Sequence, residues 1–275
     1  MKELLMSTKN REFIVETILL NNRLKRYAEY IQLAQKSDYQ VLTMKDFYNL
    51  KDRRGTGRHF ILRHDVDWQG VSPRKMFEVE RSLDVKSTYY FRFITIDVDL
   101  IHEMVEAGFE VGLHFETIAD YAKENGCSDK SEINIDDMRL RLKNDIEKFE
   151  EITGCTISSI CAHGAPENRE LGIPNNALTE DYDVSRLGIQ FEAYNKELYD
   201  DVDCHVTDSK ILFNSGFSYV DTPQSAISEQ KQNIVFLSHP NHWYLTSKWR
   251  IKYMRAFVRG KAVYSTTKTF KRIAK

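Results

Sequence analysis

The chain lacks several features that define specialised classes of protein. Its four cysteines are scattered and form no Cys-x-x-Cys pair, which argues against zinc-finger and dithiol redox motifs. No apolar run reaches the ~18 residues that a membrane-spanning helix needs. Residues 1–10 lack the apolar core and small-residue cleavage site of a signal peptide. We therefore expect a cytoplasmic protein with reduced thiols and no transmembrane segment.

Excess charge of one sign is also missing overall. The net charge is −2 over 275 residues, which argues against a general nucleic-acid binder. Residues 248–275 are an exception, because they contain ten Lys or Arg and no acid. Such a segment would suit a phosphate-bearing substrate or peripheral contact with an anionic membrane face. A solvated helix face and tail is the interpretation that we favour.

The amino-terminal part differs in pattern from the rest. Residues 11–36 carry apolar side chains at helical spacing, which predicts one amphipathic helix. Residues 39–49 resemble a short extended piece and a turn, and Gly55 and Gly57 mark a hinge. We expect a helical extension at 1–57 that packs on a catalytic domain at 58–275. The extension would cover the bottom of that domain or mediate dimerisation, and the oligomeric state stays open.

From residue 58 onward, strand-like and helical segments alternate. Strands are predicted at 59–63, 86–93, 109–114, 156–161 and 233–237, with helices beginning near 73, 100, 118, 135 and 245. Residues 167–206 are irregular. Repeated strand–helix units predict an α/β fold, which we expect to be a distorted, incomplete (β/α) TIM-like barrel with mainly parallel strands. Ligands should then bind at the carboxyl ends of the strands.

The first predicted strand ends in two acids, Asp65 and Asp67. Side chains two residues apart on a strand point to the same face, so the two carboxylates converge. Because like charges repel, a cation, a proton or a substrate dipole between them would stabilise the pair. A solvated acidic turn is the alternative for these two residues alone.

Three further strands end in groups that can bind metal. His114 and Glu116 follow the strand at 109–113, His163 follows the strand at 156–161, and His239 follows the strand at 233–237. Carboxylates and imidazoles are the ligands of catalytic Zn²⁺ or a similar divalent ion. Such an ion lowers the pKa of its bound water, while a nearby carboxylate takes a proton and a histidine gives one to the leaving group. The set is suited to hydrolysis of an amide or ester.

Four segments together resemble a known family. They read Arg63-His-Asp-Val-Asp67, Ser87-Thr-Tyr-Tyr-Phe-Arg92, Gly108-Phe-Glu-Val-Gly-Leu-His114 and Phe236-Leu-Ser-His-Pro-Asn-His-Trp243. In this order they resemble the motifs of the polysaccharide deacetylase superfamily, carbohydrate esterase family 4, and most closely its branch from surface-polysaccharide biosynthesis clusters. The resemblance covers about residues 59–243.

The resemblance implies a role for each matching residue. Asp65 would be the general base and Asp67 a metal ligand. His114 would be the first metal histidine, and His239 the catalytic acid. Thr207-Asp208-Ser209 resembles the acidic motif that orients catalytic groups, which assigns that role to Asp208.

Two positions depart from the family pattern. Ile118 stands where the family has its second metal histidine, and His163-Gly-Ala-Pro166 replaces an Arg-x-Pro motif. We infer that His163 supplies the missing ligand from the neighbouring strand end. Glu116 is the rival third ligand.

Other polar and aromatic residues near these motifs have two interpretations each. His242 and Trp243 would line a sugar site, since aromatic faces stack on pyranose rings, or Trp243 caps the interior. Arg63 and Arg92 would pair with Asp65 or a substrate anion, or form structural ion pairs. His64 lies on the opposite strand face from Asp65 and is expected to pack or to support the site.

The sequence thus predicts a metal-dependent hydrolase that removes an acetyl group from an N-acetylated sugar, with one divalent ion, expected to be Zn²⁺. The substrate would be a glycan or a nucleotide- or lipid-linked glycan precursor. One alternative is a different barrel metal hydrolase that acts on a small amide or phosphoester. Another is a carbohydrate-binding relative that has lost its metal, which Ile118 suggests.

Overall fold

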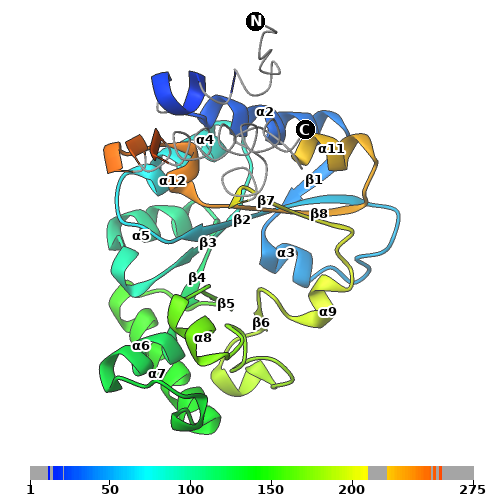
Figure 1. Ribbon diagram of the computed structural model, residues 1–275. Helices are drawn as coiled ribbons and strands as arrows, with labels where there is room; N and C mark the ends of the chain where they lie inside the picture. Colours follow the sequence, from blue (N-terminus) through cyan, green and yellow to red (C-terminus); the bar gives the residue numbers. More distant parts are fainter. Residues whose placement is uncertain are drawn as a thin grey trace, which may run out of the picture.

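Eight parallel strands form one curled sheet in the computed structural model, which describes residues 12, 15–20, 22–209, 222–248, 250–251 and 254–255 (Figure 1). The strand order is β6-β5-β4-β3-β2-β8-β7, and β1 pairs with β2 outside this path. The described residues show no pairing between β6 and β7, so the barrel is open there. This confirms the predicted distorted, incomplete barrel. The strands are β1 (Tyr39–Leu42), β2 (Arg58–Val66), β3 (Thr88–Phe91), β4 (Glu110–Phe115), β5 (Ser159–Ala162), β6 (Phe191–Glu192), β7 (Cys204–Thr207) and β8 (Asn233–Ser238).

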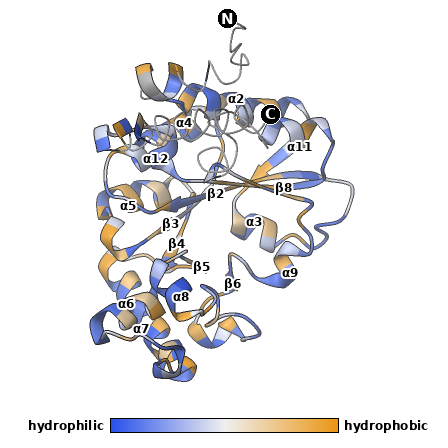
Figure 2. Ribbon diagram, viewed as in Figure 1, coloured by the Kyte–Doolittle hydropathy of each residue, from blue (hydrophilic) through white to orange (hydrophobic). Residues whose placement is uncertain are grey.

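Helices cover the outer face of the curled sheet. Figure 1 shows α2, α4, α11 and α12 in the upper part of the view, and α5, α6 and α7 below them on the left. The longer helices mix hydrophobic and hydrophilic stretches (Figure 2), as expected for helices that bury one face. The helical elements are η1 (Val15–Leu20), α2 (Leu24–Lys36), α3 (Met44–Tyr48), α4 (Ser72–Ser82), η2 (Phe93–Thr95), α5 (Val98–Glu106), α6 (Thr117–Asn125), η3 (Lys130–Glu132), α7 (Ile135–Thr153), α8 (Pro166–Leu171), η4 (Val184–Leu187), α9 (Lys196–Tyr199), α11 (Pro223–Ser228) and α12 (Pro240–Trp243).

The apolar core has three parts, set by the alternation of side chains along each strand. One fills the barrel interior, where Ile61, Tyr90 and Val235 meet Met44 and Phe47 of α3. The second lies between the sheet and helices α5 to α7. The third lies under α2, α4 and α12. Because both faces of the central strands are covered, the polar residues at their carboxyl ends are fixed by packing on either side.

A buried polar cluster lies on the outer face of β2. The Glu80 carboxylate of α4 accepts hydrogen bonds from Tyr27 (2.5 Å), Ser87 (2.9 Å) and Tyr89 (2.7 Å). His64 Nε2 lies 2.7 Å from Glu80 Oε1, and its Nδ1 lies 2.9 Å from the hydroxyl of Ser238. We call these six residues the Glu80 cluster. It joins α2 and α4 to strands β2, β3 and β8, on the face of β2 opposite to Asp65.

The amino-terminal region departs from the predicted single helix. A π-helical segment, η1, precedes α2, which begins at Leu24. The interruption occurs where the Asn22 side chain accepts a hydrogen bond from the Leu24 backbone and Asn22 bridges to Tyr244. The extended piece at 39–42 is a strand of the main sheet. The basic segment 248–275 lies mostly outside the described residues.

The irregular region at 167–206 contains three short helices, α8, η4 and α9, and two strands, β6 and β7. Among them β6 has only two residues, too short for a pattern of alternation to be recognised. None of the helices in the described part of the chain is long and apolar enough to cross a membrane.

Candidate functional site

Asp65 lies near the end of β2 with its side chain in the barrel interior, and it is 3% exposed. The buried Arg63 guanidinium donates to both of its oxygens, from Nε to Oδ1 and from Nη2 to Oδ2, each at 3.0 Å. Burial by itself would raise the pKa of Asp65, but the neighbouring Arg63 guanidinium and the His114 imidazole hold it below its ordinary value. Asp65 is therefore a fixed, ionised carboxylate.

Asp67, His114 and His163 converge from the carboxyl ends of β2, β4 and β5. Asp67 Oδ1 lies 3.4 Å from His114 Nε2 and 3.6 Å from His163 Nε2. Among the described residues, none donates a hydrogen bond to this buried oxygen. Ligand atoms about 2.1 Å from one ion at tetrahedral angles lie about 3.4 Å apart. Both distances from Asp67 Oδ1 therefore fit a shared metal ion, and the three ligand atoms all lie within 4.8 Å of one another.

The hydrogen positions on the two imidazoles strengthen this fit. His114 Nδ1 lies 3.0 Å from the Cys161 carbonyl oxygen, which can only accept, so Nδ1 carries the hydrogen. His163 Nδ1 lies 2.8 Å from Glu116 Oε1, a carboxylate whose pKa is about 2, despite burial that would raise it, because His163 and Arg92 lie beside it. Each neutral ring would then direct the lone pair of Nε2 toward Asp67 Oδ1. Three lone pairs that face one another need a cation or a proton between them.

His239 approaches the same point from the end of β8. Its Nδ1 lies 2.7 Å from Asp208 Oδ1, and its Nε2 lies 3.7 Å from Asp67 Oδ2. Asp208 is buried, and its Oδ2 accepts hydrogen bonds from the His239 backbone (2.7 Å) and the Trp243 indole (2.9 Å). Burial opposes the charged imidazole, but the Asp208 carboxylate outweighs it and raises the pKa of His239 to about 10. His239 can therefore hold a proton that faces the site.

The structure brings all the candidate residues to one end of the sheet, although three of them occupy outer positions. Glu116 faces His163 Nδ1, on the ring side away from Asp67, and Arg92 Nε lies 2.6 Å from Glu116 Oε2. His242 Nδ1 lies 3.2 Å from Asp208 Oδ1.

The structure decides between the two interpretations of Trp243 given above. Trp243 has no exposed surface, because its ring packs on Tyr27, Tyr30 and Phe236. It therefore cannot stack on a sugar, and its indole serves Asp208 instead. Ile118 is also buried, in the core under α6, and so has no access to the site.

Three residues near the site were not found from the sequence. Tyr194 packs its ring 4.2 Å from the Arg63 guanidinium carbon, and Glu192 accepts a hydrogen bond from the Ala162 backbone, next to His163. Both belong to the irregular region, where no motif marks them. Trp68 is 40% exposed at the rim, and its position directly after Asp67 was the available signal.

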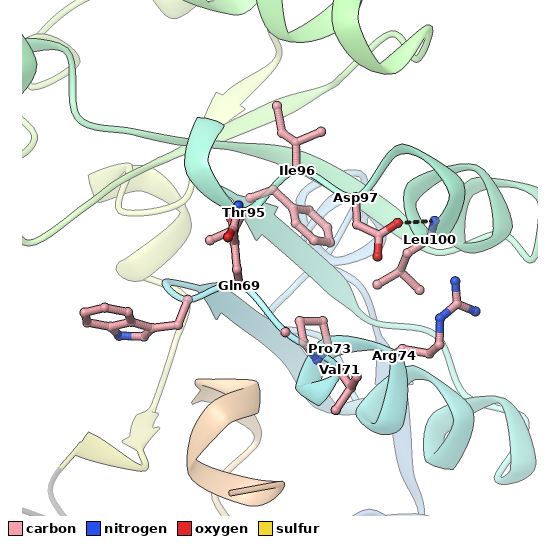
Figure 3. A pocket seen from close by; sticks show the side chains of 11 residues that line it. Gln69, Val71, Pro73, Arg74, Thr95, Ile96, Asp97 and Leu100 are labelled. Atoms are coloured by element: carbon pink, nitrogen blue, oxygen red, sulfur yellow. Dashed lines mark hydrogen bonds between the residues drawn. The ribbon is translucent and has the colours of Figure 1, made fainter. Parts of the chain in front are cut away.

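Two pockets lie beside these residues. The first, of about 410 Å³, lies between the loop after β2 and the segment that joins β3 to α5. Figure 3 shows Thr95, Ile96 and Asp97 on one side of it and Pro73 on the other. The Asp97 carboxylate accepts a hydrogen bond from the Leu100 backbone and so caps α5. The second, of about 860 Å³, lies along the open edge of the barrel, and its lining includes Tyr182, Tyr194, Tyr199 and Glu192.

No protein-family model matches the chain, and no curated protein matches its sequence. Solved structures do show similarity. A mutant of BA3943, described as a CE4 family pseudoenzyme with restored enzymatic activity, is 14% identical, with a TM-score of 0.43 over 74% of this chain and 65% of that one. Wild-type BA3943 of Bacillus anthracis, described as a CE4 family pseudoenzyme, is 15% identical, with a TM-score of 0.41 over 74% and 63%.

A third structure, the Bc1960 peptidoglycan N-acetylglucosamine deacetylase, is 12% identical, with a TM-score of 0.39 over 74% of this chain and 81% of that one. The chain thus spans slightly less than two thirds of the BA3943 structures. The two BA3943 structures are thus described as a CE4 family pseudoenzyme, and Bc1960 as a deacetylase. The likeness concerns the fold, and the chemistry of the site follows from its own residues.

Proposed function

We infer that the protein is a metal-dependent hydrolase that removes an acetyl group from an N-acetylated sugar. The observation that carries this proposal is the buried Asp67 Oδ1. It accepts no hydrogen bond from the described residues, yet it lies within 3.6 Å of an imidazole nitrogen of both His114 and His163. A buried polar atom without a hydrogen-bond partner lowers the stability of the fold, unless a bound ligand supplies the missing partner.

Asp67, His114 and His163 would hold one divalent ion, and a set of two nitrogens and one oxygen suits Zn²⁺. When bound, such an ion acidifies a water molecule and polarises a carbonyl group. The Cys161 carbonyl and Glu116 hold the two rings in the required tautomer. The site does not depend on Ile118, because His163 replaces the ligand that the family pattern places there.

Asp65 would act as the general base. It is ionised, and its Oδ2 lies 3.6 Å from His114 Nε2, on the interior side of the candidate ligands. Arg63 fixes the direction of the carboxylate through two hydrogen bonds, and each oxygen keeps a further lone pair for the proton of a water molecule.

His239 would act as the general acid. Asp208 accepts from Nδ1 and so directs the Nε2 proton toward the site. An amine leaves poorly unless it is protonated as the carbon–nitrogen bond breaks, and a protonated imidazole at this position supplies that proton. The raised pKa of His239 favours the protonated form at neutral pH.

The substrate that we propose is an N-acetylated sugar in a glycan or in a nucleotide- or lipid-linked precursor. Tyrosines with carboxylates in the larger pocket offer the ring faces and hydrogen-bonding groups that sugars need. A role in surface-polysaccharide biosynthesis and a cytoplasmic location belong to this proposal, as does peripheral membrane contact through the basic carboxyl-terminal segment.

The test is acetate release by the purified protein supplied with Zn²⁺, from N-acetylglucosamine oligomers and from a nucleotide-linked N-acetylglucosamine. We expect acetate from at least one of them, loss of release with a chelator, and recovery when metal is returned. The variant Asp67→Asn should lose both metal and release. Phosphate as the product would instead favour the phosphoesterase alternative. Failure to bind metal or release acetate would favour an inactive carbohydrate-binding protein.

A further inference from the structure

A continuous set of contacts joins two of the candidate metal ligands on the outer side of the site. Arg92 Nη1 donates to the backbone carbonyl of Asp67 at 2.9 Å. Its Nε donates to Glu116 Oε2 at 2.6 Å, and the other oxygen of Glu116 lies 2.8 Å from His163 Nδ1. The route Asp67–Arg92–Glu116–His163 therefore links the end of β2 to the loop after β5.

The fold holds the two middle members of this route firmly. Arg92 directly follows β3 and Glu116 directly follows β4, and these strands are paired neighbours. The Thr95 hydroxyl accepts a hydrogen bond from the Arg92 backbone and donates one to the Val66 carbonyl. The side chains of Arg92 and Glu116 are only 13% and 9% exposed. A largely buried, hydrogen-bonded ion pair has one favoured geometry, unlike a surface pair.

Both oxygens of Glu116 are already engaged, one by Arg92 and one by His163. The carboxylate thus faces His163 Nδ1, while His163 Nε2 faces Asp67. A carboxylate behind an imidazole fixes the tautomer and the orientation of the ring and makes the opposite nitrogen a better donor to a metal.

We propose that Glu116 and Arg92 are positioning residues that set the geometry of His163 and Asp67 for the metal ion. This proposal rests on the proposed metal site. It assigns Glu116 a place behind a ligand and not among the ligands. It also explains how His163, which lies in a loop, takes the place of the histidine that the family pattern has at the position of Ile118. Residue 118 lies in helix α6, whose backbone would hold such a ligand in place. His163 has no helix around it and depends instead on the Glu116 carboxylate.

The experiment measures the dissociation constant for Zn²⁺ by competition with a chromogenic chelator. The variants are Glu116→Gln, His163→Ala and the double variant. Glu103→Gln is the matched control, because Glu103 forms an exposed ion pair with Arg74 that touches no candidate ligand. An amide has one oxygen, so it cannot place an oxygen beside both Arg92 and His163 as the carboxylate does. We therefore expect Glu116→Gln to weaken Zn²⁺ binding by about 10- to 100-fold, with Glu103→Gln unchanged.

The double variant separates positioning from direct coordination. If Glu116 acts through His163, Glu116→Gln adds no further loss in the His163→Ala background. An unchanged constant for Glu116→Gln, or an equal loss in both backgrounds, would overturn the proposal. Wild-type protein that binds no Zn²⁺, or His163→Ala that binds it as tightly as wild type, would instead overturn the metal site itself.

Thermal unfolding of the metal-free variants shows whether each remains folded. Should Glu116→Gln not fold, Arg92→Lys takes its place, because one ammonium cannot reproduce the fork that reaches both Glu116 and Asp67. It should weaken Zn²⁺ binding in the same direction. Unchanged binding by a folded Arg92→Lys variant would then count against the proposal.

Discussion

The two faces of β2 each carry a buried polar cluster, and the two clusters differ in how completely their atoms are paired. In the Glu80 cluster on the outer face, both Glu80 oxygens and both nitrogens of His64 have partners within hydrogen-bonding distance. On the inner face, Asp67 Oδ1 accepts no hydrogen bond from the described residues. His64 and Asp65 are adjacent in sequence but belong to different clusters.

The difference separates structural from functional polar groups. A fully paired buried network stabilises and specifies the fold, because any change leaves several groups without partners. An incompletely paired group costs stability and so persists where it serves a ligand. We therefore expect changes in the Glu80 cluster to affect unfolding, and changes in the inner cluster to affect catalysis and metal binding.

The largest effect that would sharpen this contrast is expected for Asp65→Asn. The amide cannot take a proton from water, so kcat for acetate release should fall by about 10²- to 10⁴-fold. Metal content should be unchanged, because Asp65 is not among the proposed ligands. Steady-state kinetics with elemental analysis measures both. Loss of metal in this variant, with metal retained in Asp67→Asn, would show that the roles of the two acids are reversed.

His239→Ala should lower kcat for an N-acetyl sugar by about 10²-fold or more, because the amine leaves without its proton. An activated ester, whose leaving group needs no proton, should be affected much less. Parallel kinetics on the two substrates tests this. Equal losses on both would assign His239 to binding or to stabilisation of the oxyanion.

The Glu80 cluster should respond in the opposite way. Glu80→Ala leaves Tyr27, Ser87, Tyr89 and His64 without their shared partner, so the free energy of unfolding should fall by about 3–5 kcal/mol. Zn²⁺ affinity of the folded variant should stay close to wild type. Urea unfolding and metal titration provide the two measurements, with the exposed Glu103→Ala as control. A large loss of affinity at unchanged stability would remove the distinction between the clusters.

The smallest effect concerns Glu192, which is buried beside the inner cluster. Burial raises the pKa of its carboxyl to about 7, from 4.5 in the absence of the fold. The folded chain thus binds more protons than the unfolded chain between these pH values, and the free energy of unfolding should fall as pH rises from about 4.5 to about 7. The free energy of unfolding, measured with urea at several pH values in this range, should fall more steeply with rising pH for wild type than for Glu192→Gln. Equal slopes would contradict the assignment.

The convergence of the acids and histidines could be predicted because it depends on one rule, that parallel strands carry their ligands at their carboxyl ends. Asp65, His114 and His239 each end a clearly apolar segment, so their placement follows from the strand pattern. The open barrel also follows from the alternation of strands and helices.

Other features depend on packing that a single sequence does not encode. Trp243 was expected at a sugar site as readily as in the core, and only the contacts with Tyr27 and Phe236 decide this. Glu116 shares a strand face with His114, yet its side chain turns to Arg92 and His163. Tyr194 comes from a region whose strand, β6, is too short to show a period. The division at residue 57 stays a prediction, and β1, which precedes it, pairs with β2.

The most direct test is a crystal structure of the protein supplied with Zn²⁺, with the ion located by its anomalous scattering. The account predicts one ion per chain, with Asp67, His114 and His163 each about 2.0–2.2 Å away. An ion farther than about 3 Å from these side chains, or no ion at any concentration of Zn²⁺, would contradict it.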